Sequence, residues 1–70
     1  MTIEQIGEII QARREILQLT QEDLAEISGI TSKTIYLLER GKGNPSFQTL
    51  RNLLQVLGMD IEIQLRKIEE

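Results

Sequence analysis

The stretch from Thr20 to Gly41, TQEDLAEISGITSKTIYLLERG, contains two short helical patterns separated by a glycine. Thr20 is followed three residues later by Asp23, a spacing typical of a capping box, and this pair opens a helix predicted over residues 21–28. Gly29 ends that helix, because glycine adopts a left-handed backbone conformation at little cost. The first half of the stretch is therefore a short helix with a capping signal at its start and a glycine at its end.

The second half begins with Thr31, whose hydroxyl group can cap a helix predicted over residues 32–40. Two helices that cross steeply need a small side chain where their backbones approach, and Ala25 supplies it. The apolar residues of the second helix then face the first helix, so its other residues face outward. Predicted to face outward are Ser32, Lys33, Tyr36, Leu37 and Arg40.

Two further helices flank this stretch. Thr2 and Gln5 repeat the capping-box spacing and open a helix predicted over residues 3–17, in which isoleucines recur at helical spacing. Ser46 caps a helix predicted over residues 47–57, whose leucines form one apolar face. The sequence thus predicts a mainly α fold.

The segment after these helices changes its hydrophobic period. Residues 60–66, DIEIQLR, alternate strictly, with Ile61, Ile63 and Leu65 on one face, which is the pattern of a half-buried β-strand. A lone strand leaves its backbone donors and acceptors unpaired, and the sequence holds no second segment of this kind. We expect the strand to pair with the same strand of another copy about a two-fold axis, which gives an obligate homodimer. A frayed helix end or a mobile tail is the alternative.

The chain has 70 residues, of which 40% are hydrophobic and 27% are charged. This size predicts one small domain whose core is only just sufficient, so a partner subunit would add stability. We divide the chain into a helical domain over residues 1–58, a dimerisation strand over residues 59–66 and a tail over residues 67–70.

The composition lacks both cysteine and histidine, which excludes disulfides, thiolate or imidazole metal sites, and the commonest pairs of nucleophile and base. An enzyme, a catalytic residue, a bound metal and a cofactor are therefore not expected. No apolar run approaches the roughly 18 to 20 residues of a membrane span, and the N-terminus lacks the basic start of a signal peptide. We expect a cytoplasmic protein with no membrane partner.

The charges are unevenly distributed along the chain. Its net charge is −3, but residues 31–51 hold four basic residues against Glu39 alone, a net charge of +3. This positive block coincides with the second helix of the opening stretch and the loop that follows it. Such a block is typical of a surface that contacts nucleic acid, although ordinary surface scatter can give the same count in a small protein.

Several residues at fixed spacing resemble the helix-turn-helix of the Xre/Cro family, which includes lambdoid phage repressors, restriction-system controllers and many antitoxins. The resemblance covers about residues 6–58. The matching residues are Ile6, Gly7, Arg14, Leu19, Thr20, Gln21, Leu24, Ala25, Ser28, Gly29, Thr34, Ile35, Leu38, Glu39, Arg40, Gly41, Asn44, Pro45 and Ser46. The resemblance implies a lambda-repressor-like helix-turn-helix bundle of four to five helices that binds inverted repeats in double-stranded DNA as a homodimer.

The resemblance also implies roles for residues of the two central helices and the loop after them. Gln21 matches a glutamine that reaches a DNA phosphate, with simple helix capping as the alternative. Residues that match base-contacting positions are Thr31, Ser32, Lys33, Tyr36 and Leu37, of which the first can instead touch a phosphate. Residues that match phosphate-contacting positions are Arg40, Lys42 and Asn44. For Lys42 the alternative is a solvated lysine without a role.

Two positions depart from the family pattern. Gln18 stands where many relatives have glycine, so the turn after the first helix has to accommodate a side chain. Leu37 cannot form a hydrogen bond with a base: it can pack on a thymine methyl group, or its face can meet another protein. Lys33, by contrast, can donate to O6 or N7 of guanine.

Arg14 and Glu39 match a pair that, in relatives, ties the first helix to the end of the third. We interpret them as a structural ion pair rather than as DNA contacts. Removal of one partner should then destabilise the fold more than removal of both, because the remaining charge is left buried and unpaired.

A strand directly after the fourth helix is similar to the HipB-like antitoxins, whose partner is a HipA-like kinase toxin. The sequence therefore predicts a sequence-specific DNA-binding transcriptional regulator, in particular a repressor of its own operon. The alternative is an antitoxin whose main role is to bind and neutralise a HipA-like kinase toxin. RNA binding is disfavoured, because one tyrosine and one phenylalanine offer no stacking platform.

Overall fold

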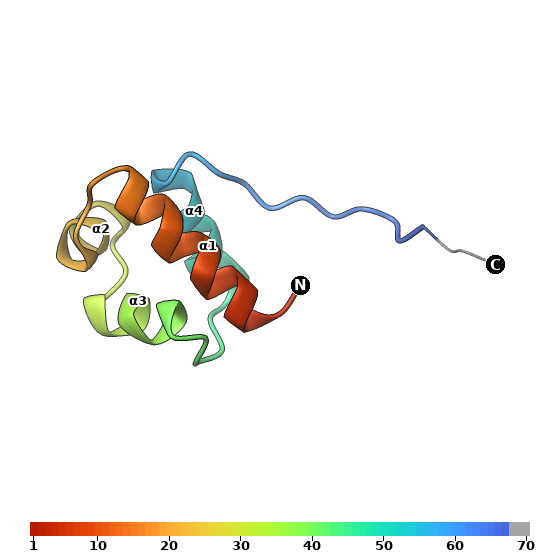
Figure 1. Cartoon of the computed structure of the whole chain (residues 1–70), viewed down its shortest axis with the longest axis horizontal. Coiled ribbons are helices and arrows are strands. Elements are labelled where there is room, and N and C mark those ends of the chain that lie inside the picture. Colours follow the sequence, from red (N-terminus) through yellow and green to blue (C-terminus); the bar gives the residue numbers. More distant parts are fainter. Residues whose placement is uncertain (68–70) are drawn as a thin grey trace.

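The computed structural model describes residues 1–67. Within this range the chain forms a bundle of four helices, followed by an extended segment that leads away from it (Figure 1). The helices are α1 (Ile3–Ile16), α2 (Gln21–Ser28), α3 (Ser32–Glu39) and α4 (Phe47–Val56). All four predicted helices are confirmed, and each ends within one residue of its expected position. None of them is long and apolar enough to cross a bilayer, as far as residues 1–67 are concerned.

The helices begin at the residues whose side chains can cap them. In front of α2, the backbone N–H of Asp23 donates to the Thr20 hydroxyl over 2.9 Å, and the Thr20 N–H donates to the Asp23 carboxylate over 2.9 Å. The bond from the Thr20 backbone lowers the pKa of Asp23 below its ordinary value. At the other end of α2, Gly29 has φ of +76°, as predicted for a left-handed stop. Local capping chemistry therefore sets the length of this helix.

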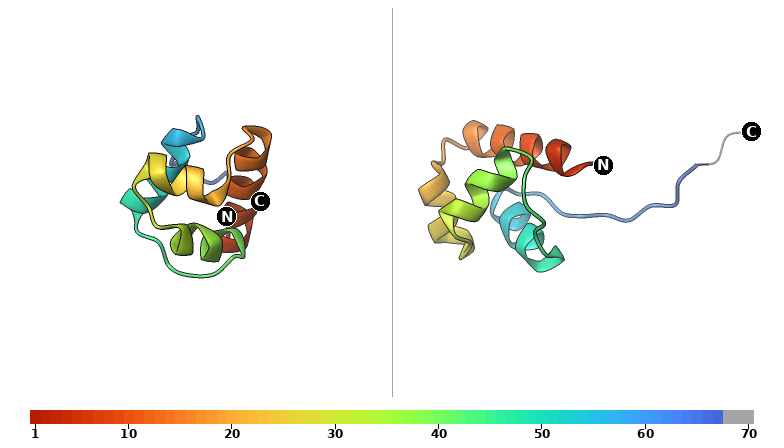
Figure 2. Two further views of the ribbon diagram at one scale, coloured as in Figure 1. Left: turned by 90° about the vertical axis from the view of Figure 1, so that its left-hand side faces the viewer. Right: turned by 90° about the horizontal axis from the view of Figure 1, so that it is seen from below.

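One hydrophobic core joins all four helices. Its fully buried side chains are Ile10, Leu24, Ile35, Leu38, Leu53 and Leu57. Helix α3 packs against both α1 and α2, and α2 also packs against α4. The Arg13 Nε donates to the Leu57 carbonyl oxygen over 2.9 Å and so ties α1 to the end of α4. This packing supports α3 from behind and leaves its other face outward, as the view from below in Figure 2 shows.

The predicted C-terminal strand does not form in the described chain. Residues 59–67 have no regular secondary structure and lead away from the bundle (Figure 1). A strand exists only when its backbone groups pair with a neighbour, and residues 1–67 contain no second strand. Ile63 is 94% exposed and Leu65 is 100% exposed, whereas Ile61 is half-buried at the start of the segment. Of the predicted tail, residues 68–70 lie outside the described residues.

The turn after α1 holds a strained residue that glycine would relieve. Gln18 has φ of +59°, the left-handed conformation that a side chain disfavours by about 1–2 kcal/mol. We expect Gln18→Gly to raise the free energy of unfolding by about 0.5–1 kcal/mol, since the greater freedom of glycine in the unfolded chain offsets part of the relief. Urea denaturation measures this change. Gln11→Gly, in the exposed middle of α1, is the control and should instead destabilise; a Gln18→Gly variant no more stable than the parent would contradict the prediction.

Candidate nucleic-acid interface

The outer face of α3 carries a row of polar side chains. Ile35 and Leu38 point into the core and are buried, so residues on the opposite side of this two-turn helix face solvent. Exposed on this side, including the residue that caps the helix, are Thr31, Ser32, Lys33, Tyr36 and Arg40. The outward placement of Ser32, Lys33, Tyr36 and Arg40 agrees with the prediction from helical spacing.

Tyr36 and Arg40 lie one helical turn apart and contact each other. The guanidinium carbon of Arg40 lies 5.4 Å from the centre of the Tyr36 ring, within the range of a cation–π interaction. Tyr36 is 48% exposed. The interaction limits the freedom of Arg40 while its charge still faces solvent, which suits a side chain that meets an anion.

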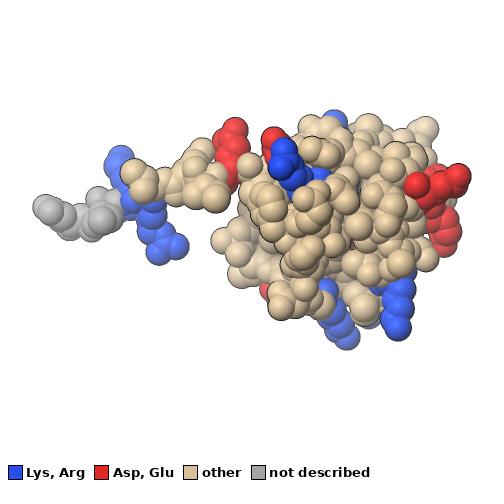
Figure 3. Space-filling model, turned by 180° about the vertical axis from the view of Figure 1, so that it is seen from behind, with Lys and Arg blue, Asp and Glu red and all other residues tan. Residues whose placement is uncertain are grey.

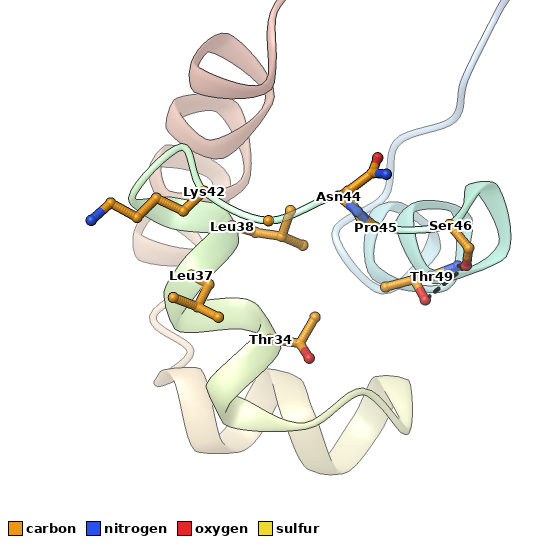
Figure 4. Close-up of a pocket in the computed structure, with 9 residues that line it drawn as sticks. Thr34, Leu37, Leu38, Lys42, Asn44, Pro45, Ser46 and Thr49 are labelled. Atoms are coloured by element: carbon orange, nitrogen blue, oxygen red, sulfur yellow. Dashed lines mark hydrogen bonds between the residues drawn. The ribbon is translucent and has the colours of Figure 1, made fainter.

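The loop after α3 presents further polar groups beside this face. The backbone N–H of Lys42 donates to the Leu37 carbonyl oxygen over 2.9 Å, which fixes the loop on the end of the helix. Lys42 and Asn44 are exposed, and Figure 4 shows the Lys42 side chain extending away from α4. Gly43, with φ of +92°, lets the chain turn between them.

Leu37 does not face fully outward, contrary to the prediction. It is half-buried and lines a hollow of about 430 Å³ together with Thr34, Pro45 and Thr49 (Figure 4). The loop residue Pro45 and Thr49 of α4 lie on the other side of this hollow. Leu37 therefore forms part of an apolar wall beside the polar row, rather than an isolated apolar side chain in solvent.

The charges divide between two parts of the surface. Among the charged side chains visible in Figure 3, several Lys and Arg side chains project from the α3 side of the molecule, and a group of Asp and Glu side chains lies at the α2 end; further charges lie at the top of the bundle and on the extended segment. The exposed acidic side chains of α2 are Glu22, Asp23 and Glu26. The negative net charge thus does not describe the α3 face, whose basic residues lie away from these carboxylates.

Arg14 and Glu39 form a buried ion pair beneath this face. The Arg14 Nε lies 2.7 Å from Oε2 of Glu39, and its Nη2 lies 2.9 Å from Oε1, so the guanidinium binds the carboxylate through two hydrogen bonds. The side chains are only 12% and 3% exposed, respectively. The hydrogen bond with Glu39 raises the pKa of Arg14 above its ordinary value. The pair joins α1 to the last turn of α3.

Gln21 also contacts this ion pair. Its Nε2 donates to Oε1 of Glu39 over 3.0 Å, and its side chain is half-buried at the first turn of α2. Gln21 is therefore held in place by the protein, and one hydrogen of its amide group remains for an outside acceptor. A purely capping role is not what the structure shows, because Thr20 caps this helix.

Comparison with known proteins identifies the fold family. Residues 10–64, most of the chain, match the family model HTH_3, described as "Helix-turn-helix". The chain belongs to the helix-turn-helix family. Its helix-turn-helix unit is α2, the turn at Gly29, and α3.

Relatives in this helix-turn-helix family carry a common designation. An "uncharacterized HTH-type transcriptional regulator" of Methanothermobacter thermautotrophicus is 40% identical over 52 residues, which cover 74% of this chain and 75% of the relative. One from Methanocaldococcus jannaschii is 39% identical over 49 residues, 70% of this chain and 74% of the relative. One from Haemophilus influenzae is 36% identical over 58 residues, 83% of this chain and 58% of the relative. These names do not specify the HipB-like branch, which stays a prediction.

Two residues that line hollows next to the outer face of α3 were not predicted as site residues from the sequence. Thr34 lies one turn before Leu37 and lines the same hollow, and three-residue spacing along the helix could have indicated it. Gln11 of α1 lies with Gln21, Tyr36 and Arg40 around a second hollow of about 330 Å³. No signal in the sequence places Gln11 there, since its position depends on how α1 crosses α3.

Proposed function

We propose that this chain is a sequence-specific DNA-binding transcriptional regulator that represses its own operon. The observation that carries the proposal is the outer face of α3, which presents Lys33, Tyr36 and Arg40 to solvent on the second helix of a helix-turn-helix. In this motif the second helix enters the major groove of DNA. The relatives named as HTH-type transcriptional regulators support the same function.

The chemistry of the face suggests a division between base and phosphate contacts. Lys33 donates to guanine, and the hydroxyls of Ser32 and Thr31 bind several bases or a phosphate. The apolar wall at Leu37 suits a thymine methyl group, which is the one apolar group in the major groove.

The remaining contacts are assigned to phosphates. Arg40 and Lys42 carry charge at the end of α3, and Asn44 offers an uncharged amide from the loop. Gln21 offers its second amide hydrogen at the start of α2. Such contacts set the position of the protein on DNA and make affinity fall by about 0.9 log units per tenfold salt for each phosphate neutralised.

Two copies of the chain form the proposed DNA-binding unit. A homodimer places its α3 helices in successive major grooves about 34 Å apart, so the operator is an inverted repeat with half-sites about one helical turn apart or a multiple of it. The apolar residues of the extended segment, Ile61, Ile63 and Leu65, are the proposed dimer contacts, because solvent exposure of such a row is unfavourable in a monomer.

The proposed division predicts different losses for two lysines. Lys33→Ala is expected to weaken binding to the selected operator by about 1–3 kcal/mol and to relax preference at one base position. Lys42→Ala is expected to weaken binding to the operator and to random duplex by the same factor. It is also expected to reduce the slope of log affinity against log salt concentration by the contribution of about one phosphate contact. Fluorescence anisotropy at several salt concentrations measures both, after selection of the operator from a random duplex library.

Lys67→Ala is the matched control for these variants. It removes one positive charge from an exposed position outside the α3 face, so it corrects for the change in net charge alone. Equal losses for Lys33→Ala and Lys42→Ala on both duplexes would reject the division. No measurable affinity of the unmodified chain for any duplex would reject DNA binding itself.

The acidic side chains on α2 favour a second candidate, an antitoxin that binds and neutralises a HipA-like kinase toxin. Glu22, Asp23 and Glu26 form an exposed negative surface away from the α3 face, and it suits a basic protein partner. Solvated helix surface is the more frequent explanation of such carboxylates. Tight binding to duplex DNA by the chain alone, with the two-lysine pattern above, favours the regulator over this candidate.

A further inference from the structure

An apolar groove lies between the first half of α1, the start of α4 and the beginning of the extended segment. It has a volume of about 510 Å³, and its main apolar lining residues are Ile9, Phe47, Leu50, Leu54, Met59 and Ile61. Two acidic residues, Asp60 and Glu62, also line it. Phe47 is 58% exposed in this groove, which we call the α1–α4 groove. No residue of α3 lines it, so the groove is separate from the candidate DNA-binding face.

The extended segment continues the apolar surface of this groove into solvent. Ile61 lines the groove, and Ile63 and Leu65 follow on the same side of an extended chain. An extended chain advances about 3.3 Å per residue, so in this conformation Leu65 lies about 13 Å beyond Ile61, outside the groove of its own bundle. The chain therefore has an open apolar groove and an apolar row that its own groove does not cover.

We propose that the α1–α4 groove receives Leu65 of a second copy, through antiparallel pairing of the two 60–66 segments centred on Ile63. This inference rests on the homodimer of the proposed function and specifies its contacts. In an antiparallel pair the second segment runs back toward the first bundle. Each copy then covers the groove of the other, and the groove is incomplete without the partner.

The side chains of the segment select this register. With Ile63 opposite itself, Ile61 lies opposite the partner's Leu65, at the edge of the groove. On the other face Asp60 lies opposite the partner's Arg66, a pair of opposite charges.

The neighbouring registers are less favourable. Pairing centred on Glu62 places this carboxylate opposite its own copy, which is a repulsive contact. Pairing centred on Gln64 also matches Ile63 with the partner's Leu65, but it places Ile61 opposite the partner's Lys67. The register centred on Ile63 is the one of the three that brings the partner's Leu65 opposite Ile61, at the edge of the groove.

The absence of cysteine makes cross-linking a direct test. We compare Ile63→Cys, Glu62→Cys and Gln64→Cys in the full chain, under mild oxidation and at a concentration where the mass is dimeric. Residues opposite each other lie within disulfide reach, whereas diagonal neighbours lie about 7–8 Å apart. We expect Ile63→Cys to form the covalent dimer at least tenfold faster than the other two variants. All three positions are exposed, so these substitutions do not affect folding of the bundle.

A second experiment tests the groove. Phe47→Ser is expected to raise the dissociation constant of the dimer at least tenfold in analytical ultracentrifugation, and Leu65→Ser is expected to do the same. Ile27→Ser is the matched control, because Ile27 is 61% exposed on α2 and does not line the groove. The dissociation constant of the Ile27→Ser dimer should stay within twofold of that of the unmodified dimer.

The outcomes separate this inference from the proposed function. A monomeric mass at all concentrations removes the homodimer and this inference with it. A dimer that cross-links fastest at residue 62 or 64, or that Phe47→Ser and Leu65→Ser leave intact, overturns the register or the groove while the homodimer stands.

Discussion

Replacing Gly7 with alanine is expected to remove most of the stability of the fold at room temperature. Gly7 lies where α1 crosses the end of α3, and an added Cβ would overlap the carbonyl oxygen of Leu38 and lie 3.3 Å from the carbonyl carbon of Glu39. These neighbours are backbone atoms, so relief requires the two helices to separate. Overpacking of this kind costs about 3 kcal/mol or more, and a domain of this size has only about 3–5 kcal/mol of stability. Far-ultraviolet circular dichroism and thermal melting measure the loss.

Gly29→Ala is the control that separates this close approach from glycine's conformational freedom. Gly29 has φ of +76°, but nothing lies within 4 Å of an added Cβ. Its substitution should cost about 1 kcal/mol, from backbone strain alone, and the variant should still melt cooperatively. If the Gly7→Ala variant melts like the Gly29→Ala variant, α1 and α3 do not approach as closely as described.

The helix boundaries could be predicted because they depend on neighbouring residues. Thr2, Thr20, Thr31 and Ser46 each accept a backbone hydrogen bond from the residue three positions later, which is the pattern visible in the sequence. The spacing of apolar residues likewise predicted which side of α3 faces outward, because this spacing alone decides which side of a helix faces the core. Both inferences need only a few residues of context.

Features that depend on distant contacts could not be predicted in this way. Leu37 has outward spacing on α3, yet it is half-buried and lines a hollow together with Pro45 of the following loop and Thr49 of α4. Gly7 inside a helix suggests only a small loss of helix propensity, whereas its importance comes from the backbone of α3. The alternation at residues 60–66 identifies an apolar row, but no strand forms without a second strand to pair with it.

The ion pair beneath the α3 face gives the second large expected effect. We expect Arg14→Met to lower the free energy of unfolding by about 3–5 kcal/mol, because it leaves the carboxylate of Glu39 buried without its cation. Chemical denaturation in a stabilising osmolyte keeps enough folded protein to measure so large a loss.

The double variant Arg14→Met, Glu39→Gln tests the reason for this loss. It removes both charges, and a glutamine at position 39 can still accept the hydrogen bond from Gln21, so the buried charge disappears while that contact persists. The Leu19 carbonyl oxygen still loses its donor, the Arg14 Nη1 at 2.8 Å, which should cost about 1–3 kcal/mol. The double variant should therefore be more stable than Arg14→Met alone. If Arg14→Met instead weakens DNA binding without lowering the free energy of unfolding, Arg14 contacts DNA and its structural role is wrong.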